Sequence, residues 1–267
     1  MLEPFEVLLD RQVSQYPMPA ELERVYGRLG FGTHEVYANF VASLDGVVSL
    51  GSTPSAGSVI SGRNPADRFL MGLLRACADA VVIGAGTMRA TPGHHWTPSH
   101  VAPEFASNFA DLRQRLGRRP EPRLVVLSAS GAIDAGHVAI QRGATVVTTE
   151  RIAKELARRL PDSCDVIGVG AGAEVDLALA VGELRARGYE MLLTEGGPHV
   201  MGDLMGGGLV DEIFLTISPV VAGRGDSERL GMVAGTELLP ANGAWSHLVS
   251  ARSHGDFLFL RYRLTPA

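Results

Sequence analysis

The sequence predicts an α/β fold with three layers, in which helices cover both faces of a mixed, mainly parallel sheet. From about residue 34, short runs of the β type alternate with stretches whose apolar residues recur at helical spacing. Two runs near the C-terminus flank a Gly-containing turn, as expected for an antiparallel hairpin. The chain has 267 residues, 46% of them hydrophobic and 20% charged, which is ordinary for a globular protein.

The N-terminal segment does not follow this alternation. Residues 1–33 contain Pro4, Pro17 and Pro19 around a short helical candidate at Ala20–Leu29. We expect these residues to form an arm that packs on the core or on a partner subunit. Residues 34–267 are expected to form a single domain, because no linker or internal repeat divides them.

The domain is predicted to begin with an alternating strand at His34–Ala42 and an amphipathic helix at Pro65–Cys77. Asn64 suits the N-cap of that helix, and Pro65 suits its first turn. Further strands are predicted at Ala80–Ile83, Arg123–Leu127, Ala144–Thr148, Asp165–Val169, Tyr189–Thr194, Asp211–Ser218, Trp245–Ala251 and Phe257–Leu264. Further helices are predicted near Pro103–Leu116, Arg151–Leu160, Val175–Arg187 and His199–Gly206.

Two glycine turns at the ends of predicted strands are candidate binding corners. In the first, the strand at Ala80–Ile83 opens into Gly84, Gly86 and Thr87; in the second, a strand ends in Glu195 and two glycines before a helix. Glycine lets backbone N–H groups approach a phosphate, and a helix N-terminus favours an anion. The irregular stretch 86–103, rich in Pro and Gly, is expected to form a loop beside the site.

Charge and composition exclude several classes of protein. The 24 Lys plus Arg against 29 Asp plus Glu give a net charge of −5, which disfavours nucleic-acid binding. Cys77 and Cys164 form no C-x-x-C pair, so neither a disulfide framework nor a zinc site is expected. The N-terminus lacks a basic signal head, and no apolar run is long enough to span a membrane. We therefore expect a cytoplasmic protein without membrane partners.

Two other patterns carry less weight. The string at Gly168–Ala173 fits G-x-G-x-x-A, but a strand-to-helix turn so late in the chain is more often a plain connector. His94, His95 and His100 cluster near Trp96 without the spacing of a zinc motif, so no metal site is expected. Asp45 lies in a polar turn after the first strand of the domain, where a carboxylate often caps its own backbone.

Taken in order, the motifs resemble those of the pyrimidine reductase family of riboflavin biosynthesis, over roughly residues 35–265. The matching segments are Ser43-Leu44-Asp45-Gly46, Ile60-Ser61-Gly62, Leu74-Arg75, Ala78-Asp79-Ala80, Gly84-x-Gly86-Thr87, Arg123-Leu124-Val125-Val126, Glu195-Gly196-Gly197, Leu209-Val210-Asp211-Glu212 and Ser218-Pro219-x-x-x-Gly223. The resemblance implies a dihydrofolate-reductase-like fold, a homodimer and NADPH as cofactor. It implies reduction of 5-amino-6-(5-phosphoribosylamino)uracil or a related pyrimidine by hydride transfer. The zinc constellation of the family's deaminase half is absent.

The resemblance also implies roles for individual residues. Substrate contacts are implied for Asn39, Ser61, Arg75 and Glu195, with the Pro54–Ser58 loop close by. Cofactor contacts are implied for Ala42, Gly84, Gly86, Thr87, Ser128, Gly196, Gly197, Pro198, His199 and Val200. Asp45 and Glu195 are the candidates for the catalytic proton donor. Arg89 and Arg151 are among the candidates for reading the 2′-phosphate of NADPH.

Two departures from the family pattern bear on the substrate. Asn39 stands where the family usually has Lys, and Thr91 stands where it usually has Asp. The first change removes a positive charge that could meet a phosphate or assist a proton transfer, and the second removes a carboxylate. Two alternatives therefore stay open: a dihydrofolate or pteridine reductase on the same fold, and a non-catalytic module that binds NADP.

Overall fold

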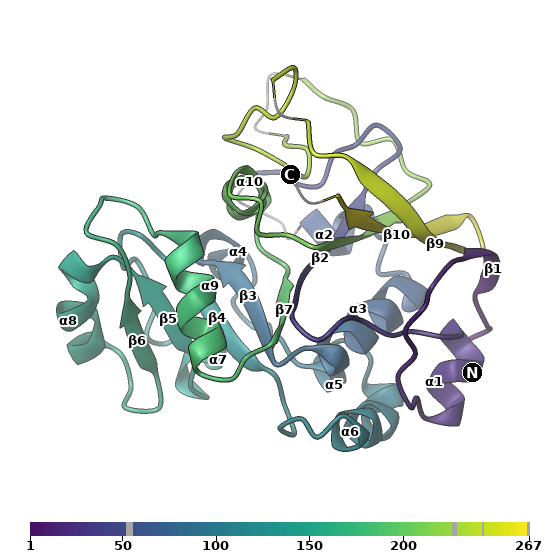
Figure 1. The fold of residues 1–267 in the computed structure, drawn as a ribbon, viewed down its shortest axis with the longest axis horizontal. Helices are drawn as coiled ribbons and strands as arrows, with labels where there is room; N and C mark the ends of the chain where they lie inside the picture. The colour runs from purple at the N-terminus through teal and green to yellow at the C-terminus, as the bar shows by residue number, and fades with distance from the viewer. Residues whose placement is uncertain (52–55, 226–228, 242, 266–267) are drawn as a thin grey trace.

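The computed structural model describes residues 1–51, 56–225, 229–241 and 243–265, and within them the strands form one ten-stranded sheet (Figure 1). The strand order is β1-β9-β10-β8-β2-β7-β3-β4-β5-β6. All pairs from β8 through β2 to β6 are parallel, whereas β10 pairs antiparallel with β8 and β9, and β1 pairs antiparallel with β9. The predicted mixed sheet with its closing hairpin is confirmed.

The predicted strands and helices occur in the predicted order, together with one strand and several short helices that the sequence did not predict. The strands are β1 Glu6–Asp10, β2 Glu35–Ala42, β3 Ala80–Gly84, β4 Arg123–Leu127, β5 Thr145–Thr148, β6 Asp165–Gly168, β7 Met191–Thr194, β8 Glu212–Ile217, β9 Ser246–His254 and β10 Phe257–Leu264. The helices are α1 Ala20–Tyr26, α2 Ala56–Ile60, α3 Pro65–Cys77, α4 Ala85–Arg89, α5 Pro98–Val101, a 3-10 turn Pro103–Phe105, α6 Ala106–Arg115, α7 Val138–Gln141, α8 Glu150–Arg159, α9 Leu177–Ala186 and α10 Pro198–Gly206.

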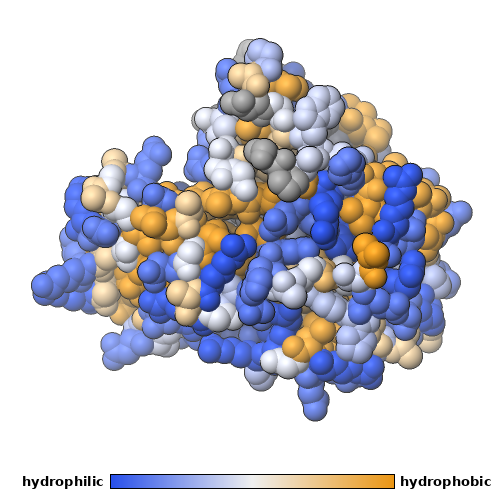
Figure 2. Space-filling model, viewed as in Figure 1, coloured by the Kyte–Doolittle hydropathy of each residue, from blue (hydrophilic) through white to orange (hydrophobic). Residues whose placement is uncertain are grey.

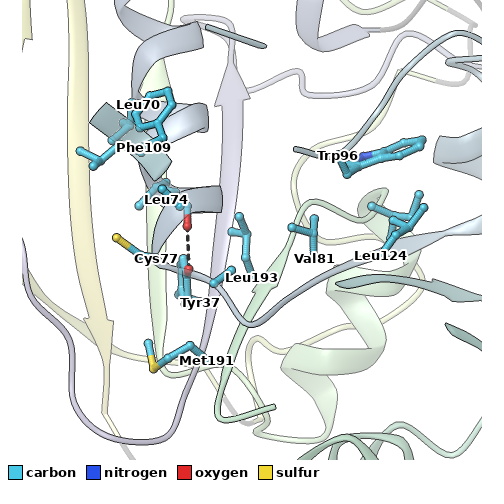
Figure 3. Packing of buried hydrophobic residues seen from close by; sticks show 14 of the residues in the cluster. Tyr37, Leu70, Leu74, Cys77, Val81, Trp96, Phe109, Leu124, Met191 and Leu193 are labelled. Carbon is cyan, nitrogen blue, oxygen red and sulfur yellow. Dashed lines mark hydrogen bonds between the residues drawn. The ribbon is translucent and has the colours of Figure 1, made fainter. Parts of the chain in front are cut away.

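Side chains that alternate along the strands separate two apolar layers. Val81 and Ile83 face the layer that contains α1, α3, α6 and α8, whereas Val82 faces the layer that contains α9. Figure 3 shows part of the first layer, where the Tyr37 hydroxyl on β2 donates to the Leu74 carbonyl on α3 at 2.8 Å. Helices therefore cover both faces of the sheet, which confirms the three-layer prediction.

Several local predictions differ from the structure. The helix expected at Ala20–Leu29 ends at Tyr26, because Gly27 takes a φ of 85° that breaks the helix. The stretch 86–103, expected to be a loop, holds most of α4 and all of α5. Short helices of this kind carry too few residues for a periodic signal. For α3 the predicted cap is confirmed, since the Asn64 side chain accepts from the amides of Ala66 and Asp67.

The N-terminal segment joins the same sheet and the same core. β1, which the sequence did not reveal, pairs with β9 at the edge of the sheet. Phe5 packs edge-on against Phe259, with ring centroids 4.7 Å apart, and Leu22 and Val25 are fully buried. Figure 2 shows apolar side chains gathered over α9 and over the end of the sheet where β1, β9 and β10 lie. Residues 1–33 thus pack on the core of their own chain.

Candidate active site

A single cavity of about 1290 Å³ collects almost all of the residues that the resemblance singles out. It is bordered by β2, the α2–α3 segment, the ends of β3, β4 and β7, and the 94–101 segment. The site residues that line it are Asn39, Ser61, Arg75, Gly84, Gly86, Thr87, Ser128, Glu195, Gly196, Gly197, Pro198, His199 and Val200. Of the Pro54–Ser58 loop, Pro54 and Ser55 lie outside the described residues, and the rest begins α2.

The two glycine corners meet because β3 and β7 are neighbouring parallel strands. A Cβ on Gly84 would lie 2.9 Å from Cγ2 of Val200, and a Cβ on Gly196 would lie 2.8 Å from Cγ1 of the same residue. A Cβ on Gly197 would come within 3.5 Å of the Thr87 hydroxyl oxygen. The glycines therefore let the start of α10 pack directly against the β3–α4 corner.

These corners have the features of a dinucleotide cradle. α10 begins at Pro198 with Gly197 as its N-cap, so the first-turn amides of His199 and Val200 have no partner within the helix. A Cβ on Gly86 would meet only Arg89 Nη2, at 3.8 Å, so the backbone there lies open to the cavity. Unpaired amides beside glycines are suited to a pyrophosphate. The residues present thus fit the nicotinamide cofactor that the resemblance implies.

Arg75 and Glu195 form a buried ion pair across the cavity wall. Nε of Arg75 donates to Oε1 of Glu195 at 3.0 Å, and its Nη2 donates to Oε2 at 2.6 Å. The same guanidinium donates to the carbonyls of His95 and Thr97, and its Nη2 lies 3.1 Å from Nε2 of His94. Arg has five N–H donors, and these contacts use all of them. In this conformation no donor of Arg75 is left for a substrate anion, although the resemblance implies a substrate contact for it.

His94 completes this arrangement as an acceptor. Burial, followed by the positive charge of Arg75, lowers the pKa of His94 to about 2. The ring is therefore neutral, and its Nε2 accepts from Arg75 when the proton sits on Nδ1. The ring of His94 lies 4.6 Å from that of His100 and 5.0 Å from that of Trp96, centroid to centroid. Among the described residues, no three metal-ligating side chains converge on one point.

Asp45 and Ala42 are predicted site residues that do not line the cavity. The Asp45 carboxylate accepts from the Ser43 hydroxyl at 2.6 Å and from the amides of Ala222 and Gly223 at 2.9 and 2.8 Å. These hydrogen bonds, that from Ser43 first, lower the pKa of Asp45 to about 2. Asp45 therefore joins two loops as a carboxylate, and it is a poor proton donor.

Asp67 is a cavity residue that the sequence alone did not single out. It lies in the first turn of α3, lines the cavity, is 6% exposed and makes no ion pair with any described residue. Burial raises its pKa to about 6, against the lowering effect of the Thr216 and Ser61 hydroxyls. The sequence held one signal: Asp67, Met71 and Arg75 recur at helical spacing, and all three line the cavity.

The remaining candidates differ in whether they line the cavity. The Gly168–Ala173 string does not line the cavity, in keeping with its interpretation as a connector. Arg89 lines the cavity, whereas Arg151 does not. No helix among the described residues is long and apolar enough to cross a bilayer.

Comparisons with known proteins agree with this architecture. The family model described as the RibD C-terminal domain matches residues 34–238. Two curated relatives, from Archaeoglobus fulgidus and Methanothermobacter thermautotrophicus, are both named 2,5-diamino-6-ribosylamino-4(3H)-pyrimidinone 5′-phosphate reductase. Each is 29% identical to this chain over 196 residues, which cover 72% and 73% of this chain and 83% and 82% of the relatives.

Solved structures support the same fold. A pyrimidine reductase-like protein from Corynebacterium diphtheriae superposes with a TM-score of 0.71 at 24% identity, covering 92% of this chain and 99% of that protein. The riboflavin biosynthesis reductase Rib7 of Saccharomyces cerevisiae gives 0.60 at 18% identity, covering 90% and 94%. At such identities the likeness shows the fold alone, and it agrees with the predicted α/β fold with a mixed, mainly parallel sheet.

Proposed function

The chain belongs to the RibD C-terminal domain family, and on that premise we propose that it is a nicotinamide-dependent reductase of a ribosylaminopyrimidine 5′-phosphate. In the proposed reaction a hydride is added to the sugar carbon bonded to the amino nitrogen, and a proton completes the reduction to the ribityl form. The observation that carries the proposal is that both glycine corners and the Arg75–Glu195 pair line one cavity. The cavity volume of about 1290 Å³ exceeds the roughly 300–1,000 Å³ of a typical one-ligand pocket, as two ligands require.

The cofactor we propose is NADPH. Thr87, Ser128 and the turn from Gly196 to Val200 would hold it, and when bound it would supply the hydride. Arg89 is the candidate for the 2′-phosphate, because it lines the cavity beside the β3–α4 corner. Its Nη1 donates to the Ala132 carbonyl at 3.3 Å, which anchors the side chain at this end of the cavity.

Two carboxyl groups, those of Glu195 and Asp67, would bind the substrate and donate the proton, respectively. Glu195, fixed by Arg75, can accept N–H donors from a pyrimidine ring on its cavity side. Asp67 is the better proton donor, because a pKa near 6 lets its carboxyl oxygen hold a proton close to neutral pH. Buried Trp96 and neutral His94 line the wall beside them and exclude water.

Thr91 does not replace the carboxylate that the family usually has at its position. Its hydroxyl donates to the Thr87 carbonyl at 2.9 Å, one turn back in the chain. Thr91 therefore stabilises the end of α4, whereas Asn39 lines the cavity as an uncharged group. The proposed chemistry accordingly depends on Asp67 and Glu195.

The test is to follow the loss of reduced-nicotinamide absorbance with purified protein. The substrates are 2,5-diamino-6-ribosylamino-4(3H)-pyrimidinone 5′-phosphate, its deaminated uracil counterpart and dihydrofolate. We expect oxidation of NADPH with at least one of the two ribosylaminopyrimidine phosphates and faster turnover with it than with dihydrofolate. Tight cofactor binding without turnover of any substrate would instead favour a non-catalytic nucleotide-binding module.

We also propose that the protein acts as a cytoplasmic homodimer, as the resemblance implies. Light scattering coupled to gel filtration measures the mass of the assembly directly. A mass of twice the chain's 28.3 kDa is expected, and a mass of 28.3 kDa would contradict this part of the proposal.

A further inference from the structure

We propose that Arg68, with Arg63 beside it, binds the 5′-phosphate of the substrate where α3 begins. This inference rests on the proposed function and adds to it the subsite that distinguishes a phosphorylated substrate from its nucleoside. Three observations support it. Some of the arginines in the cavity already have hydrogen-bond partners, whereas Arg68 has unused donors. Arg63 and Arg68 lie near the start of α3, and the distance from there to Arg75 suits the length of the substrate.

Among the described residues, four guanidinium groups line the cavity; that of Arg75 has no free donor, and that of Arg89 lies at the cofactor corner. Arg75 has all five N–H donors engaged with Glu195, His94 and the 95–97 backbone. Arg89 lies at the opposite side, at the cofactor corner, with Nη1 on the Ala132 carbonyl. Arg63 and Arg68 are the other two, both close to the N-terminal end of α3.

Among the described residues, Nε of Arg68 has a hydrogen-bond acceptor, whereas its two Nη atoms have none. Its Nε donates to the Val101 carbonyl at 2.8 Å, which fixes the half-buried side chain against α5. Within the described residues, neither of its Nη atoms makes a hydrogen bond, and no carboxylate lies within ion-pair distance of it. A guanidinium with a fixed stem and unused paired donors is suited to a phosphate, which it meets with two parallel N–H groups.

The surroundings of Arg68 are positive. Repulsion from Arg68, as well as from Arg75, contributes to the lowered pKa values of His94 and His100, in both of which burial is the first cause. Arg63 adds an exposed guanidinium from the residue just before the Asn64 cap. A phosphate dianion would offset this repulsion, since none of the described carboxylates forms an ion pair with Arg68.

The spacing along α3 matches the shape of the substrate. Arg68 and Arg75 lie on the same face of the helix, seven residues apart, which corresponds to roughly 10 Å of helix rise. With the pyrimidine ring at Glu195, beside the cofactor corner, a ribosyl chain extending along α3 brings its phosphate to the Arg68 end. Asp67 immediately precedes Arg68 on α3 and lines the same cavity.

The experiment compares a phosphorylated substrate with its nucleoside, prepared by phosphatase treatment, on wild-type protein, Arg68→Gln, Arg68→Lys and Arg63→Gln. For Arg68→Gln we expect the KM of the phosphorylated substrate to rise roughly 10- to 100-fold, as for loss of hydrogen bonds to a charged group. The KM of the nucleoside should stay unchanged, and kcat for the phosphorylated substrate should fall little. Arg68→Lys should recover part of the affinity, and Arg63→Gln should show a smaller rise.

Arg89→Gln is the matched control, because it removes a cavity guanidinium at the cofactor end. It should raise the KM for NADPH and leave the preference for the phosphorylated substrate intact. Inorganic phosphate should compete with the phosphorylated substrate on wild-type protein and much less on Arg68→Gln.

Three outcomes would overturn the subsite. The first is equal loss of activity toward both substrates in Arg68→Gln, which would mean that Arg68 only anchors Val101. The second is a wild-type protein that reduces the nucleoside as well as the phosphate, and the third is competition by phosphate that survives in Arg68→Gln. A wild-type protein that reduces neither substrate while binding NADPH would contradict the proposed function instead.

Discussion

At the scale of single residues, the buried carboxyl of Asp67 sets the expected pH dependence of activity. Its pKa of about 6 reflects burial, with Glu195 raising it and Arg68 lowering it as neighbours. If the protonated form delivers the proton, kcat falls as pH rises through about 6. Asp67→Asn should lower kcat by about 100-fold and abolish that limb of the profile, as measured by kcat over a pH series. Asp111→Asn, an exposed carboxylate on α6, should leave the profile unchanged.

The same carboxyl is expected to make the stability of the protein fall with rising pH, in the same direction as its activity. Because the pKa of Asp67 rises from 3.8 to about 6 on folding, the native state binds the proton more tightly, and stability falls as pH rises between these values. Two pH units correspond to about 3 kcal/mol lost at neutral and alkaline pH. Asp67→Asn should therefore melt at a higher temperature than wild type at alkaline pH. Equal melting temperatures there would contradict the raised pKa.

At the scale of single residues, the sequence predicted most of the residues that line the cavity, but it did not predict the contacts between them. Most of the residues named from the motifs do line it, because motifs record which strand ends face a ligand. The hydrogen bonds from Arg75 to Glu195 could not be predicted from the sequence. The two residues lie 120 positions apart, and they meet only because β7 pairs with β2 in the folded sheet. Asp67 was missed because a single acid in the first turn of a helix is also a common dipole partner.

At the scale of elements, the contact between α10 and the β3–α4 corner can be tested by substitution. Gly84→Ala places a methyl 2.9 Å from Val200 Cγ2, so the start of α10 must shift. We expect NADPH to bind about tenfold more weakly, as measured by calorimetry, because the first-turn amides of α10 move together with the helix. The double variant Gly84→Ala/Val200→Ala should recover most of the affinity. Gly182→Ala on α9, where the added methyl meets nothing within 4 Å, is the matched control.

Element boundaries were predictable where an element is long and periodic. α3 begins and ends as predicted, because it combines a cap, a first-turn Pro and an apolar face of several turns. β1 was not predictable, since its five residues are mostly exposed at a sheet edge and show no alternating burial. α4, α5 and α7 have four or five residues each, so their form depends on packing after the sheet is assembled.

At the scale of the whole molecule, the N-terminal segment provides partners for buried charges at the other end of the chain. Arg252 donates to the Tyr26 carbonyl at 2.9 Å, and Arg261 donates to Gln12 Oε1 at 2.6 Å and to the Gly30 carbonyl at 2.8 Å. Both guanidiniums are at most 2% exposed. Removing residues 1–33 leaves them without these acceptors and also removes β1 and α1 from the core.

We therefore expect a chain that starts at residue 34 to lose its cooperative thermal transition, as measured by circular dichroism. Each unpaired buried donor lowers the free energy of unfolding by about 1–3 kcal/mol. Exposure of the core residues that packed against the deleted segment lowers it further. A smaller deletion, residues 1–4, ends before Phe5 and β1 and should melt close to the full chain. A stable, active protein from residue 34 onward would show that the segment is a dispensable arm.

The pairing of Glu6 with Ser253 has a consequence for how the protein is made. During synthesis, the first strand leaves the ribosome long before its partner exists, and at about 5–20 residues per second the interval is on the order of ten seconds or more. Val7 and Leu8, which stay half-exposed even in the finished sheet, are then available to holdase chaperones or to neighbouring nascent chains. Slower translation of the last fifty or so codons should prolong that vulnerable interval and lower the yield of soluble protein.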